Sequence, residues 1–99
     1  MKYKNRRVKS RGNFRPQEVS CAYCKTPVVI YHKGGNGGLI KMQLHRIIEA
    51  EVDVGVLEST ITCPKCGKIL AKLGVYNGKP AYWIVRGQVN TRWLKNYKL

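Results

Sequence analysis

Two pairs of cysteines are the residues whose type and spacing most clearly predict chemistry. Every cysteine in the chain belongs to a C-x2-C pair, either Cys21 with Cys24 or Cys63 with Cys66. A C-x2-C turn directs both sulfurs to the same side, so two such turns can supply four thiolates in a tetrahedron around Zn²⁺. Gly67 directly follows the second pair, where a residue that tolerates positive φ suits a tight turn. We therefore expect one structural Zn²⁺ on these four cysteines.

Two other uses of the cysteines are open. Two disulfides would need an oxidising compartment, and the charged N-terminus lacks the apolar stretch of a secretory signal. A redox pair of the thioredoxin type would need C-x-x-C at a helix start within a βαβ unit, which neither pair shows. Zinc in a reducing, cytoplasmic compartment is therefore favoured. Four protein ligands leave no position for water, so the metal is expected to stabilise the fold and not to catalyse.

The charge of the chain predicts a polyanionic partner, with RNA the leading candidate. The 99 residues include 19 Lys and Arg against five Asp and Glu, a net charge of +14. Residues 1–15 and 59–99 contain no acid, so two basic ends flank a neutral middle. The residues expected to contact nucleic acid are Lys2, Lys4, Arg6, Arg7, Lys9, Arg11, Arg15, Lys65, Lys68, Lys72, Arg86, Arg92, Trp93, Lys95 and Lys98.

Other motifs do not predict catalysis. The glycine-rich segment 34–38 lacks the G-K-[ST] that a phosphate-binding P-loop needs, so it is expected to be a flexible hairpin turn. His32 and His45 are expected to serve packing, because no Ser, Asp or Glu is patterned beside them. The acids of residues 49–53 alternate as on a solvated strand face. We expect a protein that is not an enzyme.

The hydrophobic pattern predicts a mainly β fold. Asn77-Gly78 separates two apolar runs, 69–76 and 81–89, which is the strongest short signal for a β-hairpin. Tyr82 and Trp83 should point to opposite faces of their strand, one of them into the core. Further strands are expected in the runs 28–31, 39–48 and 52–56, although 39–48 also fits one face of a helix.

Three segments are expected along the chain. Residues 1–16 form a basic N-terminal arm without periodicity, which we expect to be disordered in the free protein. Residues 17–90 form a small antiparallel sheet clamped by zinc through the two C-x2-C knuckles. Residues 91–99 form a short, basic, aromatic tail or helix. No run of eighteen apolar residues exists, so no membrane helix is expected.

The cysteine spacing resembles that of the zinc-pinned β-folds of the Yippee and cereblon type. The 38 residues between the knuckles exceed the roughly 15–20 of a compact zinc ribbon. Leu70, four residues after Cys66, and the strand around Tyr76 add to the resemblance, whereas Ala71 stands where a Yippee protein carries glycine. The resemblance implies that two C-x2-C hairpins clamp one end of an antiparallel sheet.

A second resemblance concerns the layout of the whole chain. The basic arm from Lys2 to Arg15, the four cysteines and the basic segment from Arg92 to Lys98 are similar in arrangement to the small zinc-binding proteins of ribosomes. This implies contact with rRNA and with neighbouring ribosomal proteins. Two alternatives are a transcription-linked zinc ribbon that binds DNA and a β-sheet module that binds a peptide or small ligand. The second alternative would use a pocket lined by Tyr31, Trp83 and Trp93.

Overall fold

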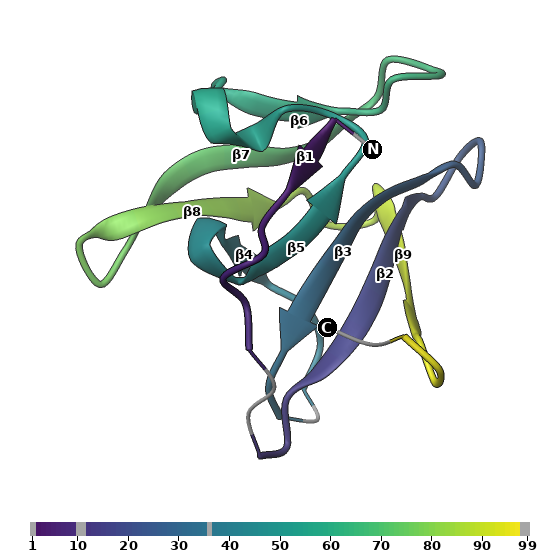
Figure 1. Ribbon diagram of the computed structural model, residues 1–99. Coiled ribbons are helices and arrows are strands. Elements are labelled where there is room, and N and C mark those ends of the chain that lie inside the picture. Colours follow the sequence, from purple (N-terminus) through teal and green to yellow (C-terminus); the bar gives the residue numbers. More distant parts are fainter. Residues whose placement is uncertain (1, 10–11, 36, 98–99) are drawn as a thin grey trace.

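The computed structural model describes residues 2–9, 12–35 and 37–97, and they form a mainly β protein. A five-stranded antiparallel sheet has the order β1-β5-β3-β2-β9, and a four-stranded one has the order β4-β8-β7-β6 (Figure 1). The strands are β1 (Tyr3–Lys4), β2 (Arg15–Cys21), β3 (Pro27–Lys33), β4 (Lys41–Gln43), β5 (Ile47–Ala50), β6 (Thr60–Thr62), β7 (Ile69–Tyr76), β8 (Lys79–Ile84) and β9 (Val89–Trp93). Two short 3-10 turns are η1 (Leu44–Arg46) and η2 (Val54–Val56).

The core lies between the two sheets. In Figure 1, the long strands β7 and β8 run across the direction of β2 and β3. Each sheet turns one apolar face inward, as the alternation of side chains along a strand allows. Tyr82 is fully buried whereas its neighbour Trp83 is exposed, so the expected split between these two aromatics is confirmed. The largest fully buried side chains are Val19, Val28, Val29, Met42, Ile47, Val54, Ile61, Leu70 and Tyr82.

The predicted hairpin at Asn77-Gly78 is confirmed. Both turn residues have positive φ, 51° for Asn77 and 74° for Gly78, as a two-residue turn of type I′ requires. The turn pairs Tyr76 with Lys79, and the antiparallel pairing continues from there to Ala71 and Ile84. This hairpin forms the centre of the four-stranded sheet, with β6 and β4 on its two sides.

Two loops differ from the expectation. The glycine-rich segment 34–38 was expected to be a hairpin turn, and its Asn36 lies outside the described residues. β3 before the segment and β4 after it belong to different sheets, so they do not form a hairpin. The alternating run 52–56 is not a strand, because its last three residues form the turn η2. The Asp53 side chain accepts a hydrogen bond from the Gly55 N–H at 3.1 Å, and Leu57 ends the turn with φ of 55°. Local side-chain bonding of this kind competes with a strand ladder.

The N-terminal arm was expected to be disordered, but Tyr3 to Asn5 lie along the edge of the five-stranded sheet. Tyr3 and Lys4 pair with Ala50 and Glu49 of β5, and the Asn5 N–H donates to the Ile48 carbonyl at 2.8 Å. These bonds involve the main chain of an edge strand, so they leave no hydrophobic pattern in the sequence.

The C-terminal segment begins as a strand and not as a helix. Thr91, Arg92 and Trp93 continue β9 alongside β2, and the Leu94 N–H donates to the Pro16 carbonyl at 3.1 Å. The Tyr97 hydroxyl then donates to the Glu49 carboxylate on β5. The tail therefore runs from one side of the five-stranded sheet to a strand near its other side.

Candidate metal centre

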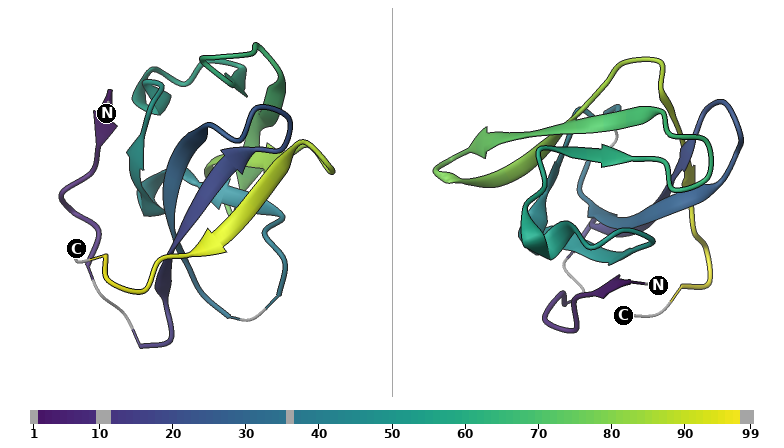
Figure 2. Two further views of the ribbon diagram at one scale, coloured as in Figure 1. Left: turned by 90° about the vertical axis from the view of Figure 1, so that its right-hand side faces the viewer. Right: turned by 90° about the horizontal axis from the view of Figure 1, so that it is seen from above.

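Two hairpin turns, one from each sheet, bring the four cysteines together. The first knuckle (residues 21–26) joins β2 to β3, and the second (residues 63–68) joins β6 to β7. Both turns lie on the same side of the molecule (Figure 2). The Sγ atoms of Cys21 and Cys66 are 3.5 Å apart, as are those of Cys24 and Cys63, and all four lie within 4.8 Å of one another. Each close pair therefore joins one sheet to the other.

The two knuckles share one backbone geometry. The N–H of the first cysteine donates to the carbonyl five residues later, at 3.0 Å in the first knuckle and 2.8 Å in the second. The residue four positions after that cysteine donates back to its carbonyl at 3.0 Å in both. That residue is left-handed, Lys25 with φ of 64° and Gly67 with φ of 82°. The tight turn holds the two sulfurs of each knuckle on one side, as the C-x2-C spacing predicts.

The sulfur geometry fits a metal ion better than it fits disulfides. Zn–S bonds of about 2.3 Å in a tetrahedron place the sulfurs about 3.8 Å apart. The closest sulfurs here are 3.5 Å apart, whereas a disulfide needs about 2.05 Å. All four cysteines are free, and in the part of the chain that the structure describes they are the one group arranged to hold a metal. Four soft thiolates suit a thiophilic ion.

The close packing of the cluster shifts the pKa values of its thiols. The Thr26 hydroxyl, 3.1 Å from the Cys24 sulfur, lowers the pKa of Cys24 to about 6. The main-chain N–H of Lys68 acts to lower the pKa of Cys66, but burial and the three neighbouring cysteines outweigh it and raise the pKa to about 12. Thiolates this close repel one another, so a divalent cation among them would favour their ionised forms.

The residues expected to bind nucleic acid lie on several sides of the fold. Five of these cations lie just before, on or just after β1, at one edge of the five-stranded sheet: Lys2, Lys4, Arg6, Arg7 and Lys9. Arg92 and Lys95 lie on or just after β9 at the other edge. Lys65 and Lys68 lie in the second knuckle, Lys72 on β7, and Arg86 in the turn after β8. Arg11 and Lys98 lie outside the described residues.

Some of these side chains already contact the protein. Arg92 forms an ion pair with Glu18 at 3.2 Å. The guanidinium of Arg15 lies 4.3 Å from the centre of the Trp93 ring, which is half-buried. Lys68 places its ammonium 4.6 Å from the ring centre of Tyr23. Trp93 is thus partly covered within the chain.

The structure also brings together a group that the sequence prediction missed. Lys41 on β4, Tyr76 on β7 and Trp83 on β8 meet on the outer face of the four-stranded sheet. A signal for part of this group is present in the sequence, because the two-residue turn at Asn77-Gly78 sets the pairing of β7 with β8. The position of Lys41 depends on the tertiary fold.

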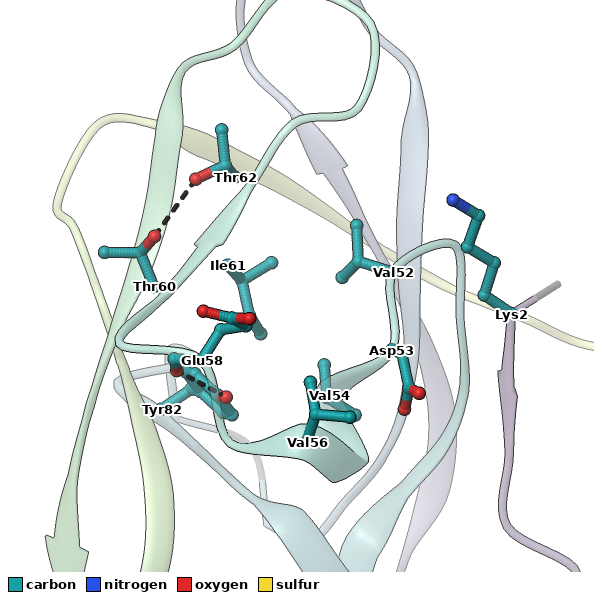
Figure 3. Close-up of a pocket in the computed structure, with 10 residues that line it drawn as sticks. All are labelled: Lys2, Val52, Asp53, Val54, Val56, Glu58, Thr60, Ile61, Thr62 and Tyr82. Carbon is teal, nitrogen blue, oxygen red and sulfur yellow. Dashed lines mark hydrogen bonds between the residues drawn. The ribbon is translucent and has the colours of Figure 1, made fainter.

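A cleft of about 440 Å³ lies beside β6 (Figure 3). Val52, Val54, Val56 and Ile61 give it an apolar lining. Its polar groups serve the local structure: the Tyr82 hydroxyl donates to a main-chain carbonyl at 2.8 Å, and two threonine hydroxyls lie 3.1 Å apart. The aromatics expected to line a ligand pocket are elsewhere, with Tyr31 in the core, Trp83 on the outer face and Trp93 on β9.

No protein-family model, curated protein or solved structure matches this chain. The resemblances to the Yippee and cereblon folds and to small ribosomal proteins thus remain predictions. Within the described residues, no helix is long and apolar enough to cross a membrane.

Proposed function

We propose that this chain is a zinc-stabilised RNA-binding protein without catalytic activity, and that it acts as a component or close associate of the cytoplasmic ribosome. In this proposal the four cysteines hold one structural Zn²⁺. The metal connects the two sheets, and the basic segments at both ends of the chain contact the phosphates of rRNA.

The observation that carries the proposal is positive charge that acidic side chains of the described residues hardly neutralise. The chain has 19 Lys and Arg and five acids, and the described residues contain a single ion pair, Arg92 with Glu18. Most of the cationic side chains are exposed. Such a surface attracts a polyanion through the release of its counterions.

The arrangement of acids supports the same proposal. Strands β4, β7 and β8 contain no Asp or Glu. On the five-stranded sheet, in contrast, Glu18 and Glu49 are both opposite Ile30, and the tail contacts both acids through Arg92 and Tyr97. The acids that could repel phosphate are therefore partly occupied by the chain's own C-terminal segment.

The salt dependence of RNA binding tests this function. Each neutralised phosphate adds about 0.7 to 0.9 to the slope of log affinity against log salt. Replacing the basic residues of 2–9 with Gln should reduce the slope by up to about 4, because five cations are removed. The substitutions keep Tyr3, which packs against the core, so the metal content should not change. A slope near zero for the intact protein would refute the proposal.

Two further experiments separate the partners. Sedimentation of the tagged protein through sucrose gradients, with and without ribonuclease, should show migration with ribosomal particles that ribonuclease abolishes. Retention at high salt would indicate an integral component, and release would indicate a peripheral factor. Competition between duplex DNA and structured RNA at the same salt distinguishes the proposal from a DNA-binding zinc ribbon. If the proposal holds, structured RNA should displace duplex DNA from the protein.

A further inference from the structure

The outer face of the four-stranded sheet has a group of aromatic and basic side chains, the aromatic platform, made of half-buried Lys41 and Tyr76 and exposed Trp83. The Tyr76 and Trp83 rings meet edge to face, with centres 6.3 Å apart and planes at 71°. The Lys41 ammonium lies 3.9 Å from the centre of the Tyr76 ring and 5.7 Å from that of Trp83. Tyr76 is thus covered by a cation, while Trp83 stays 38% exposed.

A glycine opposite the indole shapes this platform. Gly74 on β7 has no side chain, and a Cβ there would lie 2.8 Å from the Cδ1 and Nε1 atoms of Trp83. The indole therefore packs against the main chain of β7 at a distance that any other residue would prevent. Close packing against a strand holds the ring in place at little cost in side-chain entropy, so a ligand meets a preformed surface.

Charge complementarity identifies the ligand. Lys41 and Lys72 are both directly opposite Trp83 on the neighbouring strands, and Lys79 is opposite Tyr76. No acid on β4, β7 or β8 neutralises these lysines. An exposed aromatic ring between uncompensated cations is the combination that binds a nucleotide, since the ring stacks on the base and the cations contact its phosphates.

We propose that the aromatic platform binds an unpaired base of single-stranded RNA, with the base stacked on Trp83 and the flanking phosphates held by Lys41 and Lys72. This rests on the proposed function and specifies which kind of RNA the site takes. Bases inside a duplex are stacked on each other and cannot reach the indole, so the platform requires a single strand or an exposed loop.

The test uses Trp83→Ala and a fluorescein-labelled ten-nucleotide oligouridylate, with affinity measured by fluorescence anisotropy. Loss of one stacked base lowers affinity by about 5-fold to 150-fold. The salt slope should not change, because no cation is removed. Tyr23→Ala is the matched control, since Tyr23 is 57% exposed and also lies beneath a lysine, but belongs to the first knuckle.

Two additional readouts separate a stacking role from a structural one. Oligouridylate should quench tryptophan fluorescence in the wild-type protein, and Trp83→Phe should lose this quenching while it retains part of the affinity. Binding to a blunt RNA duplex should be the same for Trp83→Ala and wild type. Circular dichroism and metal content should show that the variants remain folded.

The outcomes distinguish this inference from the proposed function. If Trp83→Ala binds oligouridylate as wild type does while the salt slope stays steep, the platform proposal is overturned and general RNA binding stands. If the intact protein binds no RNA, both fail. Stacking at Trp83 would also be overturned if Trp83→Ala lost affinity equally for duplex and single-stranded RNA. The same holds if the substitution changed only the self-association of the protein, measured by analytical ultracentrifugation.

Discussion

Removing one of the four cysteine ligands should separate the contribution of a bound metal to stability from that of the hydrophobic core. Cys66 is suited to this because it is exposed, whereas Cys21 and Cys63 are buried and their replacement would also leave cavities. In Cys66→Ala the metal loses one of four ligands, and little packing changes. The exposed Lys65→Ala, in the same turn, is the control.

The expected loss in the free energy of unfolding follows from the length of the loop that a bound metal would close. Cys24 and Cys63, whose sulfurs are 3.5 Å apart, differ by 39 in residue number. A cross-link around a loop of this length lowers the entropy of the unfolded chain by an amount equivalent to about 4 kcal/mol at 25 °C. For a domain of this size that corresponds to roughly 15–30 °C in Tm. Metal–ligand bonding adds to this figure, so it is a lower bound.

Guanidinium unfolding followed by circular dichroism, with saturating Zn²⁺ and with EDTA, measures the effect. Wild type should lose at least about 4 kcal/mol in EDTA. Cys66→Ala should be nearly insensitive to the metal and should resemble wild type in EDTA. Lys65→Ala should behave as wild type in both conditions. The reasoning is refuted if EDTA leaves the wild-type midpoint unchanged, or if Cys66→Ala still gains the full stabilisation from Zn²⁺.

Three further predictions concern the turns and the tyrosines. Gly67→Ala should lower the unfolding free energy by about 1–2 kcal/mol in the same denaturant titration, because φ at this position is 82°. Gly37→Ala is the control, because a Cβ there would meet no atom and φ is not positive, so its unfolding free energy should stay within about 0.5 kcal/mol of wild type. Tyr82→Phe should cost about 1 kcal/mol, since its buried hydroxyl donates a 2.8 Å hydrogen bond, and a gain in stability would contradict this role. Burial and the Glu49 carboxylate raise the pKa of Tyr97 from 10.0 to about 12, so the neutral phenol stabilises the fold below pH 10 and this stabilisation is lost as pH rises through about 12. The advantage of wild type over Tyr97→Phe in urea should therefore shrink between about pH 9 and pH 12, and a constant difference would argue against the Tyr97–Glu49 contact.

Local sequence signals determined the parts of the fold that depend on neighbouring residues. The C-x2-C spacing predicted the two knuckles, because a tight turn brings sulfurs three residues apart to the same side. Asn77-Gly78 predicted a hairpin, because both residues tolerate the positive φ that the turn needs. The same turn sets the register of β7 with β8, so the relation of Tyr76 to Trp83 in the aromatic platform was available from the sequence.

The tertiary structure decided the contacts between distant segments, which no local sequence pattern predicts. Tyr3 and Lys4 of the arm pair with β5 through main-chain hydrogen bonds, and such bonds are independent of side-chain type. The connection from β3 to β4 takes the chain from one sheet to the other, as the pairing partners of these two strands show. Lys41 reaches the aromatic rings only because β4 pairs with β8, and the two cysteine pairs meet only because the turns of different sheets lie together. Contacts between segments distant in the sequence depend on the whole core, whereas turns depend on a few adjacent residues.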